Sequence, residues 1–166
     1  MKFTSRILSA AGLVVALAMG AVSQNVMTAI QSIDRVTAAF ANLDKQVEQV
    51  TKDNAADKGP PIEGDFRRVV EVLQNELSFL EEGDIHSRNS EDGRSVLAAY
   101  SGLVKTAHWG MLKRLVNKRD IVPPNFVGQV GPAARTLRHE SEFYSEFFRH
   151  LLYTRDQLKD FEVLHA

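Results

Sequence analysis

Histidine and glutamate are the side chains of this sequence whose spacing could bind a metal ion or move a proton. His139 and Glu140 open the segment His-Glu-Ser-Glu-Phe, which begins like the zinc-binding helix motif but has Phe143 where the second histidine must stand. Glu162 and His165 have the Glu-x-x-His spacing of di-iron bundles, but such sites need a second copy of the motif and two further glutamates. Both patterns are incomplete, so the sequence predicts no metal site.

Glu142, Glu146 and His150 follow one another at intervals of four residues, so they share one side of a helix. A metal site and a solvated face with local ion pairs both fit this spacing, and the ion pairs are favoured. The sequence has no cysteine, no Gly-x-Ser-x-Gly elbow, no phosphate-binding loop and no dinucleotide fingerprint. We therefore expect a protein that is not an enzyme and needs no cofactor.

The composition is that of one ordinary globular domain. The chain has 166 residues and a formal net charge of −1, which gives no reason to expect nucleic-acid binding. Basic residues gather at Lys113, Arg114, Lys118 and Arg119, where they suit the carboxyl end of a helix, and we favour that interpretation over a basic binding patch. Because cysteine is absent, the fold must depend on packing alone.

Residues 1–23 have the layout of a secretory signal peptide. Lys2 and Arg6 precede an apolar run, and small residues end it, which predicts cleavage before Gln24, with Gly20–Ala21 as the second choice. The alternative is an amino-terminal membrane anchor, but the run is short for a spanning helix. No second run of that length follows. We expect a secreted, extracellular protein whose domain is residues 24–166 and which has no transmembrane span after cleavage.

Apolar residues recur every three to four positions through most of residues 24–166, which predicts an all-α fold, an antiparallel bundle of four long helices. We expect the helices at 25–52, 65–82, 94–119 and 125–155. Residues 156–165 are either the last turns of the fourth helix or a short fifth one. Gly59, Pro60 and Pro61 place a loop at 54–64, and residues 84–93 read as a polar connection. Gly102 and Gly110 inside the third helix suggest that something bulky lies close to it.

The segment from Glu142 to Tyr153 has more apolar surface than a bundle seam needs. Its large side chains form two adjoining rows on one helix, which are Phe143, Phe147 and Leu151, and Tyr144, Phe148 and Leu152. One interpretation is that these side chains fill the core. Because both rows cannot be fully covered in a simple four-helix bundle, the alternative is that part of this face lines a cleft between helices or is exposed to bind something apolar. The candidate ligand-binding residues are Tyr100, Trp109, Met111, Phe126, Phe143, Phe147 and Leu151. Candidate polar contacts at the mouth of such a cleft are Arg138, His139, Arg149 and Lys113.

Two segments resemble a known family. Val26 to Val47, which reads VMTAIQSIDRVTAAFANLDKQV, resembles the opening helix of the fungal hydrophobic surface-binding protein A family, which includes cell-wall galactomannoproteins. Leu112 to Val122, LKRLVNKRDIV, with the long helix that follows it, is similar to the family's later helices. The resemblance implies a secreted helical protein that adsorbs to hydrophobic surfaces. It also implies recruitment of a secreted polyester-degrading hydrolase in some members and fatty-acid binding between helices in others.

These observations give one leading hypothesis and one alternative. The leading hypothesis is a secreted, non-enzymatic protein that binds a hydrophobic surface or a fatty-acid-like lipid through its apolar helix faces. Such a protein would be extracellular or loosely associated with the cell wall, because the chain lacks the Ser/Thr-rich tail that anchors related proteins there. The alternative is a secreted protein–protein interaction module, an effector or a structural component of the wall, in which the Phe143 face docks a partner helix.

Overall fold

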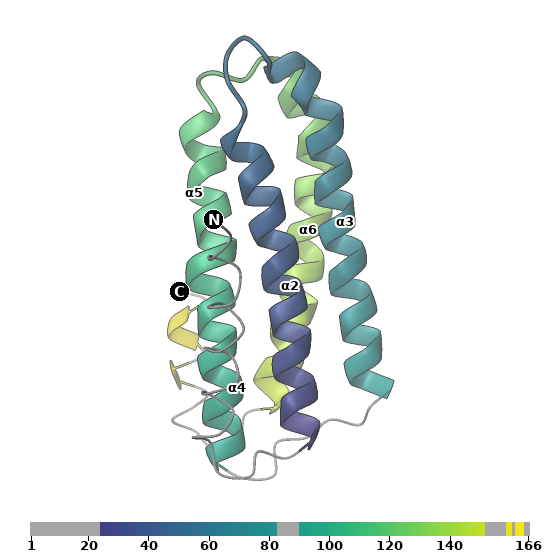
Figure 1. Cartoon of the computed structure of the whole chain (residues 1–166), viewed down its shortest axis with the longest axis vertical. Coiled ribbons are helices and arrows are strands. Elements are labelled where there is room, and N and C mark those ends of the chain that lie inside the picture. Colours follow the sequence, from purple (N-terminus) through teal and green to yellow (C-terminus); the bar gives the residue numbers. More distant parts are fainter. Residues whose placement is uncertain (1–23, 83–89, 152–158, 161, 165–166) are drawn as a thin grey trace, which may run out of the picture.

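The computed structural model describes residues 24–82, 90–151, 159, 160 and 162–164, and these residues form a helical bundle without strands (Figure 1). Its elements are α2 (Gln24–Glu48), α3 (Ala55–Glu82), α4 (Ser90–Gly102), the π-helical segment η1 (Leu103–His108), α5 (Trp109–Lys118) and α6 (Pro124–Leu151). Because α4, η1 and α5 follow each other directly, they make one long helical rod. The all-α bundle that the sequence predicts is confirmed. The expected signal peptide lies outside the described residues.

Consecutive rods run in opposite directions, but two pairs of neighbours are parallel. Arg35 on α2 pairs with Glu76 on α3, and these two helices run in opposite directions (Figure 1). The α4–α5 rod runs parallel to α2, because Phe40 contacts His108 and, farther along both helices, Lys118 contacts the Glu48 carbonyl. The second parallel pair is α3 and α6 (Figure 1). The bundle therefore places α2 between α3 and the α4–α5 rod, with α6 packed most closely on α3 (Figure 1). The α4–α5 rod stands at the corner opposite α3.

The apolar stripe that the sequence predicts for residues 25–52 forms one wall of the core. Seven of its eight residues are buried and Ile30 is partly buried against them; the other seven are Val26, Ile33, Val36, Phe40, Leu43, Val47 and Val50. Val47 and Val50 close this wall at the top, where the backbone N–H of Val50 donates to the Val47 carbonyl at 3.1 Å. Lys118 then donates to the free Glu48 carbonyl at 2.9 Å and ties α5 to the end of α2. The basic cluster lies in the last turns of α5, as the sequence predicts, and Lys118 also bonds to the end of α2.

The loop predicted at residues 54–64 is wrong, because α3 begins at Ala55 and runs through Gly59, Pro60 and Pro61. The physical reason is burial. Ala55 and Ile62 are both fully buried, so the helix covers core surface from its first turn. The two prolines have no backbone N–H to donate to the carbonyl groups of the preceding turn. Because both prolines are exposed, water can reach those carbonyl groups. A Cβ at position 59 would lie 2.2 Å from the side-chain oxygen of Gln129 on α6, so glycine permits this close approach.

The third predicted helix begins earlier than expected, at Ser90, and six of its residues form the π-helical segment. Trp109 marks the wider turn, since its backbone N–H donates to the carbonyl of Val104, five residues back. The explanation offered for Gly102 and Gly110 is wrong for the described residues, where an added Cβ on either glycine would meet nothing within 4 Å. Val116 continues the apolar spacing of residues 94–119, which predicts an inward side chain, but it is 61% exposed, so that prediction is wrong.

The rotation of α6 about its axis decides which large side chains of residues 143–151 are buried. The Tyr144 hydroxyl lies 2.8 Å from that of Ser32 on α2, and both residues are almost fully buried. The ring of Phe148 packs 5.4 Å from that of Tyr100 on α4, centroid to centroid. These contacts turn Tyr144 and Phe148 of the second row inward, and Leu151 of the first row is buried as well. The apolar spacing of residues 125–155 also predicts that Phe143 faces inward, but its side chain is 51% exposed, so that prediction is wrong. Leu152 lies outside the described residues.

The end of the described chain lies against α4. Lys159, Asp160 and Glu162–Leu164 are helical, and Leu164 is half-buried against the core. We call these residues the C-terminal segment. Asp160, Val163 and Leu164 share a groove with Leu97 and Ala98 of α4, so this segment packs beside the rod rather than extending α6. Residues 152–158, expected within or just after the fourth helix, lie outside the described residues.

Candidate functional site

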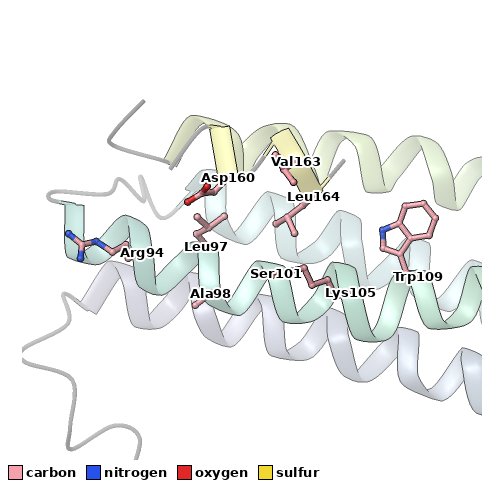
Figure 2. Close-up of a pocket in the computed structure, with 9 residues that line it drawn as sticks. All are labelled: Arg94, Leu97, Ala98, Ser101, Lys105, Trp109, Asp160, Val163 and Leu164. Atoms are coloured by element: carbon pink, nitrogen blue, oxygen red, sulfur yellow. The ribbon is translucent and has the colours of Figure 1, made fainter. Parts of the chain in front are cut away.

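A groove of about 600 Å³ runs along the outer side of the α4–α5 rod (Figure 2). It is lined by Arg94, Leu97, Ala98, Ser101, Lys105, Trp109, Asp160, Val163 and Leu164. We call it the α4–α5 groove. From residue 94 to residue 109 a helix rises about 22 Å, so the groove is long, and it is open to solvent along its outer side. Its volume lies within the range of small-molecule sites, about 300–1,000 Å³.

Helical spacing brings the groove residues of the rod to one side. Leu97, Ser101, Lys105 and Trp109 succeed each other at intervals of four, so their side chains line one flank (Figure 2). The π-helical segment allows these four side chains to line the groove while the opposite side of the rod stays buried. On that opposite side, Leu103, Val104 and Ala107 enter the core. The C-terminal segment supplies the second flank.

The groove surface combines apolar side chains with unpaired charge. Leu97 and Leu164 are half-buried, whereas Trp109 is 47% exposed and Val163 is 76% exposed. Within the described ranges, Arg94 and Lys105 make no ion pair or hydrogen bond, although both border the groove. Asp160 adds one carboxylate on the opposite flank. Such a surface can cover an acyl chain and place a cation beside an acidic head group.

The seven candidate residues predicted from the sequence do not meet in one place. Trp109 lines the α4–α5 groove. Four others belong to the core, with exposed fractions of 5% or less: Tyr100, Met111, Phe126 and Leu151. Phe143 lies on the surface of α6, and Phe147 is half-buried beside Phe148.

The residues suggested as polar contacts at the mouth of a cleft either contact neighbours on their own helices or lie away from the groove. Arg138 bonds Glu142 at 3.0 Å, and Arg149 bonds Glu146 at the same distance. The ring of His139 meets that of Phe143 edge-on at 4.7 Å. Lys113 is exposed on α5, beyond the groove lining.

Tyr100 belongs to the core and is not part of the groove lining. Its hydroxyl is hydrogen-bonded to that of Ser145 on α6, which joins the rod to α6 across the core. Burial raises the pKa of Tyr100 to about 12, and the hydrogen bond with Ser145 opposes that change. A neutral phenol is therefore held in the core at physiological pH.

The spacing of Glu142, Glu146 and His150 produces local ion pairs, as predicted. His150 Nε2 lies 3.1 Å from Glu146, and Glu142 pairs with Arg138 at 3.0 Å. Across the part of the chain that the structure describes, no three or more His, Asp or Glu side chains are grouped so that they could hold a metal ion. His165 of the Glu-x-x-His pattern lies outside the described residues.

Sequence reasoning missed Lys105, Ala98 and the C-terminal segment as parts of a site. The intervals of four from Leu97 to Trp109 were a usable signal for one flank. No pattern in the sequence places residues 159–164 beside α4, because that contact depends on how the chain returns after α6.

Comparison with protein-family models, with curated proteins and with solved structures finds no match for this chain. In the described ranges, none of the helices has both the length and the apolar character needed to cross a bilayer.

Proposed function

We propose that this protein is a secreted, non-enzymatic binding protein that holds a fatty-acid-like lipid in the α4–α5 groove. The observation that carries the proposal is the groove itself, an open and largely apolar depression of about 600 Å³ whose lining includes a half-exposed tryptophan. Each 100 Å² of apolar ligand surface removed from water contributes about 2.5 kcal/mol. Lys105, which has no partner among the described residues, is the candidate contact for a carboxylate.

The same function is the one that the resemblance to the hydrophobic surface-binding protein A family implies. Membership of that family stays a prediction. Secretion rests on the layout of residues 1–23. Attachment to a hydrophobic solid would use the same exposed groove residues, Trp109 and Val163.

Trp109 makes the proposal easy to test, because it is the only tryptophan of the chain and lines the groove. Titration with oleate, below the concentration at which it forms micelles, should change the intensity and wavelength of its emission and reach saturation. Ala98→Phe should remove this response, since Ala98 is exposed on the groove wall and a phenyl ring there fills the channel.

Ala38→Phe is the matched control, because it puts the same ring on an exposed alanine of α2, in a different depression between α2 and α3. That variant should bind oleate like the unsubstituted protein. An unchanged Trp109 emission in oleate, or equal binding by both variants, would contradict the proposal.

A second function has one observation in its favour. Phe143 is 51% exposed on α6 and carries the ring of His139 edge-on at 4.7 Å. An exposed aromatic pair on a long helix suits a protein partner that offers an apolar pocket. Under this alternative, Phe143→Ala abolishes partner capture and leaves the oleate titration unchanged.

A further inference from the structure

The α4–α5 rod has a charge pattern unlike the rest of the chain. From Arg94 to Arg119 there are six basic residues and no aspartate or glutamate. Residues 24–93 and 120–166 together contain 12 basic and 21 acidic residues. One corner of the bundle is therefore cationic in a protein whose net charge is negative.

Part of this charge is used inside the bundle. Arg114 bonds Asp44 at 2.7 Å and Glu48 at 3.0 Å, and Lys118 donates to backbone carbonyl groups at the end of α2. Arg119 pairs with the neighbouring Asp120. Lys105 and Lys113 differ from these, because both are exposed and neither has an ion pair with any described residue.

The two free lysines alternate with exposed apolar side chains on one side of the rod. Lys105, Trp109, Lys113 and Val116 follow at intervals of three and four residues, which places them together on the outer side of η1 and α5. Trp109 is 47% exposed and Val116 is 61% exposed. We call these four residues the Trp109 face.

We infer that the Trp109 face docks the protein on an anionic lipid bilayer. Tryptophan is favoured at the boundary between head groups and acyl chains, where its ring is covered and its N–H stays hydrated. Lysines beside it attract acidic head groups, and each contributes about 5-fold in affinity near such a surface. The rod then lies along the surface as an interfacial helix with its axis in the membrane plane.

The surroundings of the face agree with this orientation. Val163, which is 76% exposed, lines the same groove as Trp109 and adds exposed apolar area farther along it (Figure 2). The acidic groups of the C-terminal segment lie toward the other end of the rod. Asp160 shares the groove with Arg94, and Glu162 lies 3.9 Å from Arg149. The lysines of the face therefore meet the surface without a neighbouring carboxylate bound to them.

This inference does not depend on the groove holding a lipid molecule. A protein that binds oleate but no vesicle keeps the groove proposal and loses this one. A protein that binds vesicles but no oleate gives the reverse result.

The test is co-sedimentation with vesicles, read together with the emission of Trp109. Vesicles of phosphatidylcholine and phosphatidylserine in equal amounts should bind the protein and shift its emission to shorter wavelength, and binding should weaken as salt is added. Vesicles of phosphatidylcholine alone should bind far less. Replacing both lysines, K105Q with K113Q, should lower affinity for the mixed vesicles about 25-fold.

The control variant R67Q with R68Q removes the same charge from α3, which lies opposite the rod (Figure 1). Both arginines are exposed, with 65% and 75% of their side chains accessible. All forms are produced through the same secretory route, so that any residues retained before Gln24 contribute equally. The control should bind mixed vesicles within 2-fold of the unsubstituted protein, a bound well below the effect of one lysine on the face.

Three results would overturn the inference. Equal binding to neutral and mixed vesicles would remove the role of charge. An equal loss in the two double variants would show that net charge, not this face, is responsible. Binding to soluble polyglutamate without binding to mixed vesicles would assign the face to an acidic protein partner.

Discussion

The hydroxyl pair between Ser32 and Tyr144 offers a sharp test of how the bundle orients α6. The two oxygens are 2.8 Å apart and connect α2 to α6 across the core. Ser32 is 0% and Tyr144 is 2% exposed, so neither hydroxyl has access to bulk water. This contact accompanies the inward position of Tyr144 and the outward position of Phe143.

The two single substitutions should cost unequal amounts of stability. Ser32→Ala leaves the Tyr144 hydroxyl buried without its partner, which costs about 1–3 kcal/mol. Tyr144→Phe costs less, about 0.5–1.5 kcal/mol, because Ser32 can turn its hydroxyl to the backbone carbonyl of Thr28, one helical turn earlier. The double variant S32A/Y144F removes both polar groups together and should cost less than the sum of the two single changes.

Urea unfolding followed by circular dichroism measures these three free energies. Thr136→Ala is the control, because its exposed hydroxyl bonds only its own helix, at 3.3 Å from the Pro132 carbonyl. That control should stay within about 0.5 kcal/mol of the unsubstituted protein. A double variant whose cost equals or exceeds the sum, or a Tyr144→Phe variant less stable than Ser32→Ala, would refute the reasoning.

Three further outcomes follow from the same structure. Gly64→Ala and Gly110→Ala should each raise the unfolding free energy by about 0.5–1 kcal/mol in urea titrations, because an added Cβ meets nothing within 4 Å at either site; a loss of stability would contradict this account. Arg114→Gln should lower the thermal midpoint, and by less at high salt, since its partners Asp44 and Glu48 lie at the surface of α2; an effect independent of salt would count against the ion pairs. Burial raises the pKa of Tyr100 to about 12 and raises that of Tyr144 further, so stability should fall as pH rises above about 10, where both phenols ionise in the unfolded chain. Tyr100→Phe should reduce this alkaline loss and leave the part that comes from Tyr144, and an undiminished loss would contradict a contribution from Tyr100.

Periodicity predicted the helices well where burial agrees with local propensity. The stripe of α2 enters the core as expected, because an apolar interval of three and four residues has only one way to be covered in a bundle. The start of α3 was missed because Gly59, Pro60 and Pro61 signal a loop locally, while the buried Ala55 and Ile62 favour a helix.

The candidate site was predicted less well than the fold. The two rows of α6 are equally apolar in sequence, and contacts with Ser32 and Tyr100 from other helices decide that Tyr144 and Phe148 face inward while Phe143 does not. Trp109 was named from its type alone. Val163 and Leu164, which line the same groove, come from the C-terminal segment. The position of that segment depends on the path of the chain after α6, and no residue spacing predicts this path.

If lipid binds along the outer side of the α4–α5 rod, backbone amide shifts recorded by NMR during titration with oleate should locate it there. We expect saturating changes at residues 94–109, 160 and 162–164, with little change around Phe143 on α6. Saturating changes centred on α6, or spectra that oleate leaves unchanged, would contradict it.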